Sequence, residues 1–347
     1  MTVLLCSLKR IVPVFILLLC VLPLGVFAAE QEPVESQPAK EKTFDPNEVI
    51  IHHVLDDHIW HLWDGHYGTL YLPVIVYSSE KGLAIFSSHH FYDEHHNAIE
   101  YDGYKLEHNH IIMADSGHAV LDLSITKIVA MLLINATLLI LVFLAVAKGC
   151  RTNKGSAPRG IQSFLEPVIV FVRDDVVKAN IGKHYEKFLP YMLTLFFFIL
   201  FGNMLGLLPG AGNMSGNIAI TLTLAVFTFI ITNVNGNKAY WSHIFWTPGV
   251  PLVLRPIIML VEVIGIFTKP FALTIRLFVA VTAGHIVLLS LICLAFIFNS
   301  IYVGIGSTVM IVFINLIEIL VSAIQAYVFT LFTSLYIGMA TAEEDHH

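Results

Sequence analysis

Ionisable side chains interrupt a long apolar stretch in the C-terminal part of the chain, at a spacing that suits a helix. Glu262, Lys269 and Arg276 recur every seven residues, and seven residues turn an α-helix through about 700°, so the three form one stripe. His285 follows nine residues after Arg276, about 180° around the helix and roughly 13 Å further along it. A charged side chain at bilayer depth costs about 2.5–3.5 kcal/mol and is functional by default.

A second polar stripe lies on the last apolar stretch. It contains Asn315, Glu318, Ser322 and Gln325 at positions i, i+3, i+7 and i+10, which share one face of a helix. Together the two stripes offer a permanently charged guanidinium, a histidine and a carboxylate. Histidine exchanges protons readily because its unperturbed pKa is about 6.5. This set of side chains indicates proton transfer inside a helical bundle.

Each of these residues also has a purely structural explanation. Lys269 stands near the start of a span, where its side chain can snorkel to the interface, and Glu262 is equally compatible with an interfacial position. Arg276 differs, because about ten apolar residues precede it and a longer apolar run follows it, which leaves snorkelling a poor explanation. A functional role is therefore best supported for Arg276, and His285 and Glu318 support each other.

The composition of the whole chain predicts that these helices lie in a membrane. Of 347 residues, 56% are hydrophobic and only 13% are charged, and the mean hydropathy is +0.75. A soluble domain carries about 25% charged residues, so a soluble enzyme and a disordered protein are both excluded. The chain has neither the basic patch typical of nucleic-acid binding nor a P-loop motif. We expect an all-α integral membrane protein with a polar N-terminal third.

The N-terminal third is predicted to be exported. Lys9 and Arg10 precede an apolar run from Ile11 to about Leu22, followed by small residues, which is typical of a signal peptide comprising residues 1–28; an uncleaved anchor helix is the alternative. Residues 29–125 form an extracytoplasmic region with 12 of the 17 histidines. Short apolar runs at 70–77 and 83–86 predict a β-hairpin there, and 104–113 could add a strand.

The remaining residues, 126–347, are predicted to form a membrane domain of about five embedded helices. Residues 128–147, 189–208 and 218–232 are apolar segments close to the ~20 residues that a span needs. A basic stretch follows the first of them, so this side is cytoplasmic, as is the C-terminus. Apolar residues at three- and four-residue spacing between 161 and 177 predict an amphipathic helix on the membrane surface.

The last two apolar stretches, 251–298 and 307–340, are too long for simple spans. They run to roughly 70 and 50 Å, against a hydrocarbon core of about 30 Å. Either the first stretch breaks into two spans at Lys269-Pro270, or both stretches form long helices that are steeply inclined in the bilayer. The break would place Lys269 in an outer loop, against the charge rule, so we prefer an inclined C-terminal hairpin.

The segment around Arg276 resembles a known family. Residues 269–285 read KPFALTIRLFVAVTAGH, which resembles the Lys-Pro…Leu-Arg-Leu-Phe…Ala-Gly-Glu/His segment of subunit a of F-type ATP synthases. Residues 324–329 and 335–340, IQAYVF and LYIGMA, are similar to the terminal helix of that family. The resemblance covers roughly residues 125–342.

The resemblance implies roles for individual residues. Arg276 corresponds to the essential arginine of the family and Gln325 to its terminal-helix glutamine. His285 and Glu318 stand where many bacterial members carry an acidic residue and a histidine, so the two types are exchanged here. By this resemblance His285, Glu318 and Gln325 line the path by which protons enter from outside.

Other positions are implied less strongly. Glu262 matches an acidic position fourteen residues before the arginine and is expected at the inner exit, and Lys269 and Asn315 are accessory candidates. Ala280 stands where many members have asparagine, so a polar wall residue is missing or replaced. The family says nothing about the histidine-rich region.

The resemblance also implies the function and the partners. The chain is expected to be a stator subunit of the Fo sector that forms two aqueous half-channels against a rotating c-subunit ring and couples proton flow to ATP synthesis. It is no enzyme by itself and is expected to need no cofactor or metal. Its expected partners are the c-subunit ring, subunit b of the peripheral stalk, other ATP synthase subunits, the lipid bilayer and protons. The export signal favours a bacterial inner membrane.

Two other classes of protein stay open on the residues alone. A proton-coupled secondary transporter would show inverted repeats, and the sequence contains no such repeat. A metal-uptake protein is suggested by the histidines, yet their spacing is not that of a metal site, so a solvated loop is preferred.

Overall fold

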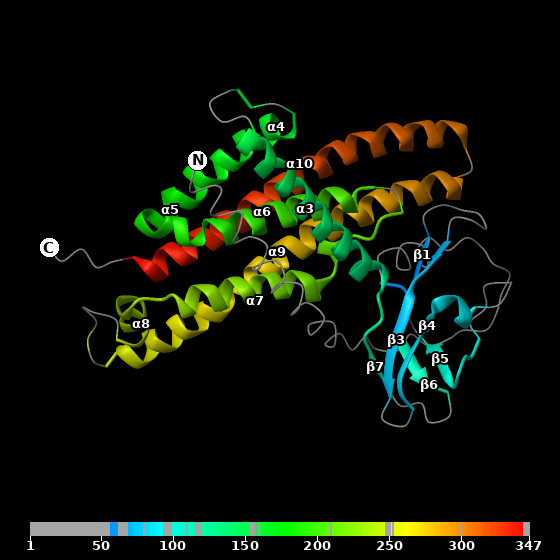
Figure 1. Ribbon diagram of the computed structural model, residues 1–347, viewed down its shortest axis with the longest axis horizontal. Coiled ribbons are helices and arrows are strands. Elements are labelled where there is room, and N and C mark those ends of the chain that lie inside the picture. Colours follow the sequence, from blue (N-terminus) through cyan, green and yellow to red (C-terminus); the bar gives the residue numbers. More distant parts are fainter. Residues whose placement is uncertain are drawn as a thin grey trace.

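The computed structural model describes two parts of the chain, a small β-sheet region and a helical bundle (Figure 1). The described residues are 56–61, 69–78, 81–92, 99–107, 110–114, 120–152, 157–158, 160–208, 210–246, 251, 253–298 and 300–342. The predicted signal peptide, residues 1–28, lies outside them. The strands gather at the end of the bundle where α3 begins, and α8 lies at the opposite end.

Within the described residues, the strands pair antiparallel in two two-stranded sheets and one three-stranded sheet. They are β1 (Ile59–His61), β2 (Thr69–Tyr71), β3 (Pro73–Ser78), β4 (Gly82–Ser87), β5 (Tyr104–Glu107), β6 (His110–Met113) and β7 (Leu121–Asp122). The predicted hairpin is confirmed as β3–β4, in which Val74 lies opposite Phe86. The predicted strand within 104–113 is instead a second hairpin, β5–β6. Side chains of both hairpins, among them Val76 and Tyr104, form a small apolar core.

The helices account for most of the described chain. They are α3 (Lys127–Thr152), α4 (Ile161–Phe171), the π-helical turn η3 (Val172–Lys178), α5 (Ala179–Ile181), α6 (Tyr185–Gly206), α7 (Ile218–Val234), α8 (Lys238–Phe245), α9 (Arg255–Phe298) and α10 (Ile301–Thr341). Short 3-10 turns η2 (Ser88–Phe91), η4 (Gly182–His184) and η5 (Met214–Gly216) complete the order. Within the described residues, four helical stretches are long and apolar enough to cross a membrane, and up to five if α7 and α8 together form one bent span. The four are Lys127–Thr152, Ile161–Gly206, Arg255–Ala295 and Ile301–Thr341. The protein is therefore a multi-pass membrane protein, as predicted.

Helix α6 forms the centre of the bundle. All residues from Phe188 to Ile199 are buried, because a helix that is apolar on every side is stable only when other helices or lipid surround it. On one side the Phe143 ring of α3 meets the Phe197 ring at 5.1 Å. On another, the Tyr191 hydroxyl and Thr228 Oγ1 of α7 are 2.9 Å apart.

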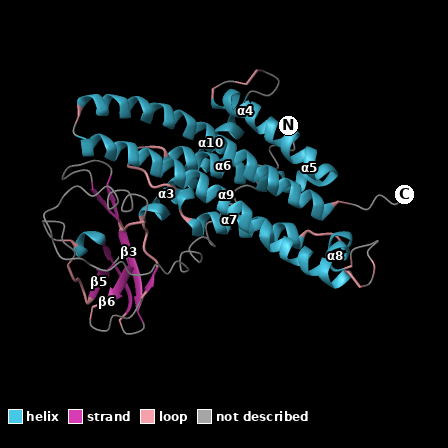
Figure 2. Cartoon of the chain, turned by 180° about the vertical axis from the view of Figure 1, so that it is seen from behind, coloured by secondary structure: helices cyan, strands magenta, loops and turns pink. Residues whose placement is uncertain are grey.

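The two C-terminal helices form one long antiparallel hairpin (Figure 2). Helix α9 continues through Pro270, and the Thr274 hydroxyl donates to the Pro270 carbonyl at 3.0 Å. Pro270 itself lacks the N–H that would bond the Ile266 carbonyl, and membrane helices tolerate this gap where neighbouring helices and local adjustments compensate for it. The preferred single helix is thus confirmed and the break at Lys269-Pro270 is wrong, while the inclination in the bilayer stays a prediction.

Candidate functional site

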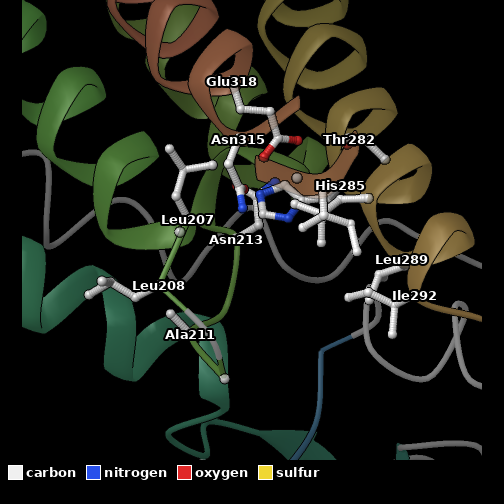
Figure 3. Close-up of a pocket in the computed structure, with 15 residues that line it drawn as sticks. Leu207, Leu208, Ala211, Asn213, Thr282, His285, Leu289, Ile292, Asn315 and Glu318 are labelled. Atoms are coloured by element: carbon white, nitrogen blue, oxygen red, sulfur yellow. The ribbon is translucent and has the colours of Figure 1, made fainter. Parts of the chain in front are cut away.

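A cavity of about 340 Å³ opens between α9, α10 and the loop that joins α6 to α7. Figure 3 shows that Glu318 and Asn315 of α10 and His285 of α9 converge in it. The rest of its lining is largely apolar and comprises residues 206–208, 210, 211, 213, 216, 282, 288, 289, 292 and 311. The structure therefore brings together three of the side chains that the sequence singles out.

Glu318 is deeply enclosed although it carries a carboxyl group. The residue is only 7% exposed, and neither carboxyl oxygen has a hydrogen-bond partner within the described part of the chain. Its carboxyl group lies against the backbone of α9 at Gly284, where an added Cβ atom would be 3.2 Å from the Glu318 Cδ. A side chain at this position would therefore displace the Glu318 carboxyl group.

Two further polar side chains line the cavity, and neither is among the residues predicted from the sequence. Asn213 comes from the loop before α7, and Thr282 comes from α9 one turn before His285. Asn213 Oδ1 and Thr282 Oγ1 are buried and have no hydrogen-bond partner among the described residues. Polar atoms of this kind usually bind water. Thr282 could have been found, since it stands three residues before His285, whereas Asn213 sits in a segment that only signals a turn.

Arg276 lies outside the cavity, in a different environment. Its guanidinium Cζ lies 4.2 Å from the centroid of the Phe332 ring on α10, a distance at which cation and ring attract each other. Its Nη1 has no hydrogen-bond partner in the described chain. No ion pair of the described residues involves it. The charge is therefore held by an aromatic ring, and a carboxylate partner is lacking within the described chain.

The antiparallel contacts between α9 and α10 give the order of the predicted residues along the hairpin. Glu318 faces Gly284, Arg276 faces Phe332, and the Nζ of Lys269 lies 5.4 Å from the centroid of the Tyr336 ring. Gln325 is seven residues from both Glu318 and Phe332, so it lies on nearly the same face, about 10 Å along the helix from each. Gln325 thus stands between the cavity and the arginine.

Glu262 is remote from the cavity. It precedes His285 by 23 residues, which is about 35 Å along a helix, and it is partly exposed. It attracts Lys269 electrostatically, although the two form no ion pair among those that the described chain contains. The predicted site residues therefore form a series along one hairpin and do not share one pocket.

This arrangement suits proton movement better than chemistry on a substrate. The cavity offers a histidine, a carboxyl group, two amides and a hydroxyl group, which can pass protons through bound water. The described residues contain no cluster of three or more His, Cys, Asp or Glu side chains that could hold a metal ion. A guanidinium beyond the cavity cannot give up its proton at working pH.

Comparisons with known proteins point in the same direction. The family described as ATP synthase A chain matches residues 129–338. ATP synthase subunit a 2 of Chlorobaculum tepidum is 47% identical over 235 residues, which are 65% of this chain and 66% of that relative. ATP synthase subunit a of Chlorobium phaeobacteroides strain BS1 is 44% identical over 77% of this chain and 79% of its own length. ATP synthase subunit a 2 of Chlorobium luteolum is 39% identical over 90% of this chain and 81% of its own length.

The N-terminal part matches a different family. Residues 49–128 match a family described as a domain of unknown function. This region includes the described strands β1 to β7 and ends at the start of α3.

Proposed function

Because the chain belongs to the ATP synthase A chain family, we infer that it is the proton-translocating stator subunit of an ATP synthase Fo sector. It works with other ATP synthase subunits as a component of the proton channel. The observation that carries the mechanism is the placement of Arg276 beyond a cavity that contains Glu318 and His285. The relatives do not favour the proton-coupled transporter.

In the proposed mechanism, the cavity is the half-channel that opens to the outside. Protons enter through it, exchange on His285 and Glu318, and pass Gln325 to reach a carboxylate on a partner subunit. Such a partner is a ring of c subunits whose buried carboxylates carry the protons around. Glu262, at the far end of α9, serves the inner exit, and Asn315 and Lys269 are accessory.

Arg276 acts as the barrier between the two half-channels. Its charge attracts an ionised ring carboxylate, and because it cannot deprotonate, it blocks direct passage of protons. The absence of a carboxylate partner for Arg276 within the described chain supports a partner that arrives from another subunit, since a buried charge needs compensation. The chain itself performs no ATP chemistry.

The proposed setting is a bacterial inner membrane. The β-sheet region lies on the extracytoplasmic side of this membrane and the C-terminal end of α10 lies in the cytoplasm, in accordance with the basic segment that follows α3. Subunit b of the peripheral stalk is the expected second neighbour. The proposed organisation is a signal peptide (1–28), an extracytoplasmic region (29–125) and a proton-channel domain (126–347).

The test uses membrane vesicles that contain the assembled complex. Arg276→Ala should abolish proton-driven ATP synthesis while the complex still assembles, because electrostatic control is lost and packing is not. Lys269→Ala, a second cation seven residues away on the same helix, is the matched control and should keep most activity. Parental rates of ATP synthesis in Arg276→Ala vesicles would contradict the proposal.

A further inference from the structure

The first described segment of the β-sheet region, residues 56–60, is attached to the end of the helical bundle. The Ile128 N–H donates to Asp56 Oδ1 at 3.0 Å, and the Lys127 N–H donates to the Asp57 carbonyl at 2.9 Å. Asp56 thus satisfies a free backbone donor in the first turn of α3. The segment is therefore fixed to the bundle at the point where α3 begins.

Trp60 extends this contact to the loop between α6 and α7. Its indole Nε1–H donates to the Gly210 carbonyl at 2.6 Å, and its ring is only 9% exposed. The ring packs with Leu72 and Met131 in a small apolar cluster that Ala211 also joins. A buried tryptophan N–H normally requires a partner, and the Gly210 carbonyl supplies it, so this bond joins the loop to the β-sheet region.

The same loop forms the rim of the cavity. Gly210, Ala211 and Asn213 all line it (Figure 3). Gly210 has a φ of 78°, a left-handed conformation that glycine adopts readily. Gly212 packs on the Lys127 side chain, where an added Cβ would lie 3.3 Å from the Lys127 Cγ. The rim is therefore held by the β-sheet region and by the start of α3, from outside the cavity.

A buried pair of side chains holds the segment itself. His58 is 3% exposed, and its Nε2 lies 3.1 Å from Asp122 Oδ2 on β7. Burial would raise the pKa of Asp122, but the hydrogen bonds from His58 and Ser124 outweigh it and hold this pKa below its ordinary value. The segment that carries Trp60 is thus tied to the sheet on one side and to the loop on the other.

We propose that Trp60 is a positioning residue that holds the 210–213 loop away from the cavity and keeps the entrance for protons open. Six of the fifteen lining residues are leucine or isoleucine, and apolar walls close on each other when nothing holds them apart. The β-sheet region, through this contact, is part of the proton-entry apparatus. The interpretation of the cavity as the entrance for protons rests on the proposed function. The effect of Trp60 on access of water-soluble reagents to the cavity does not.

The first test measures whether water-soluble reagents reach the cavity. Leu289→Cys places a thiol in the lining on α9, away from the loop, in complexes in which Cys150 and Cys293 are replaced by serine. Trp60→Phe keeps a ring in the cluster and removes the indole donor, and it should slow labelling by a hydrophilic maleimide from outside about fivefold, the effect of one net hydrogen bond. Trp246→Phe, at the opposite end of the bundle, is the matched control and should label at the parental rate.

A second variant and a functional readout make the test complete. Gly210→Ala strains the same loop from its own side and should slow labelling in the same direction. In vesicles, the Trp60→Phe complex should also require a more acidic exterior for half-maximal ATP synthesis. Its rate of ATP hydrolysis at saturating ATP, measured after uncoupling, should be unchanged. If Trp60 had only a structural role, the dependence of ATP synthesis on the external pH would be unchanged.

The two proposals can fail separately. Unchanged labelling and an unchanged pH profile in Trp60→Phe complexes that assemble would overturn the positioning role, even if Arg276 behaves as proposed. If Arg276→Ala vesicles synthesise ATP normally, the proposed function fails, while slower labelling in Trp60→Phe would still establish control of the cavity.

Discussion

The hairpin of α9 and α10 has two different regions although both are built from the same pair of helices. In the region next to the loop between α6 and α7 the helices leave a cavity, and Glu318 and His285 line it. About 10–15 Å further along α9, the Arg276 guanidinium lies over the Phe332 ring and outside that cavity. One region has space and groups that titrate, and the other has a charge that does not titrate.

In the proposed mechanism, this difference lets one pair of helices both admit protons and stop them. Uptake requires room for water beside groups that change charge near working pH. A barrier requires a charge that stays fixed, and a ring face stabilises a guanidinium without accepting a proton. The proposed contrast in function would therefore come from which side chains face each other along the hairpin.

The largest effects are expected when the fixed charge is lost, and Arg276→Lys, which makes that charge titratable, should fail nearly as badly as Arg276→Ala. Arg276→Lys should reduce proton-driven ATP synthesis about 100-fold, a loss typical of removing a positioned charge-stabilising donor. The reason is that lysine lacks the planar guanidinium fork and can deprotonate when it is desolvated. The rate of ATP synthesis in vesicles at a fixed proton gradient measures this. A Lys variant with more than half of the parental rate would show that any cation suffices.

Exchanging the two titratable groups tests whether they act as a pair in the cavity. His285→Glu and Glu318→His should each impair ATP-driven proton pumping, and the double exchange should recover more activity than either, with a coupling of about 1 kcal/mol in a double-mutant cycle. If both single variants behave like the parent, the pair is structural.

The close contact between Gly284 and Glu318 predicts a smaller effect. Gly284→Ala should displace the carboxyl group and slow proton uptake about fivefold, as expected for overpacking of about 1 kcal/mol. Gly265→Ala on the same helix is the control, because an added Cβ there meets no atom within 4 Å. Equal pumping rates in the two variants would mean that the position of Glu318 is unimportant.

The smallest effects belong to the far end of α9. Glu262→Ala should slow coupled transport partially, since this carboxylate is partly exposed and water can replace it. Lys269→Ala should be mild, because its ammonium group interacts with the face of Tyr336 and weakly with Glu262. Quenching of a pH-sensitive dye during ATP-driven pumping measures both. Complete loss of pumping in Lys269→Ala would overturn the snorkelling explanation.

The sequence predicts the helical part of this structure well. Apolar length and spacing identify α3, α6, α7 and the two long helices, and the stripes of polar residues identify Glu318, His285 and Arg276. The pairing of Glu318 with Gly284 depends on the relative shift of two helices, which no local pattern contains. Asn213 and Trp60 come from a turn and from a strand in which neither spacing nor charge signals a role, so only the packing reveals them.

The most direct test asks whether the two regions lie in series on one path. Vesicles stripped of the catalytic sector should leak protons when they carry Arg276→Ala, because no fixed charge then separates the half-channels. Adding Glu318→Gln should reduce that leak about tenfold or more, as expected when a proton-transfer group is removed. A leak through Arg276→Ala that is unchanged by Glu318→Gln would contradict the account, since protons would then reach the arginine without passing through the cavity.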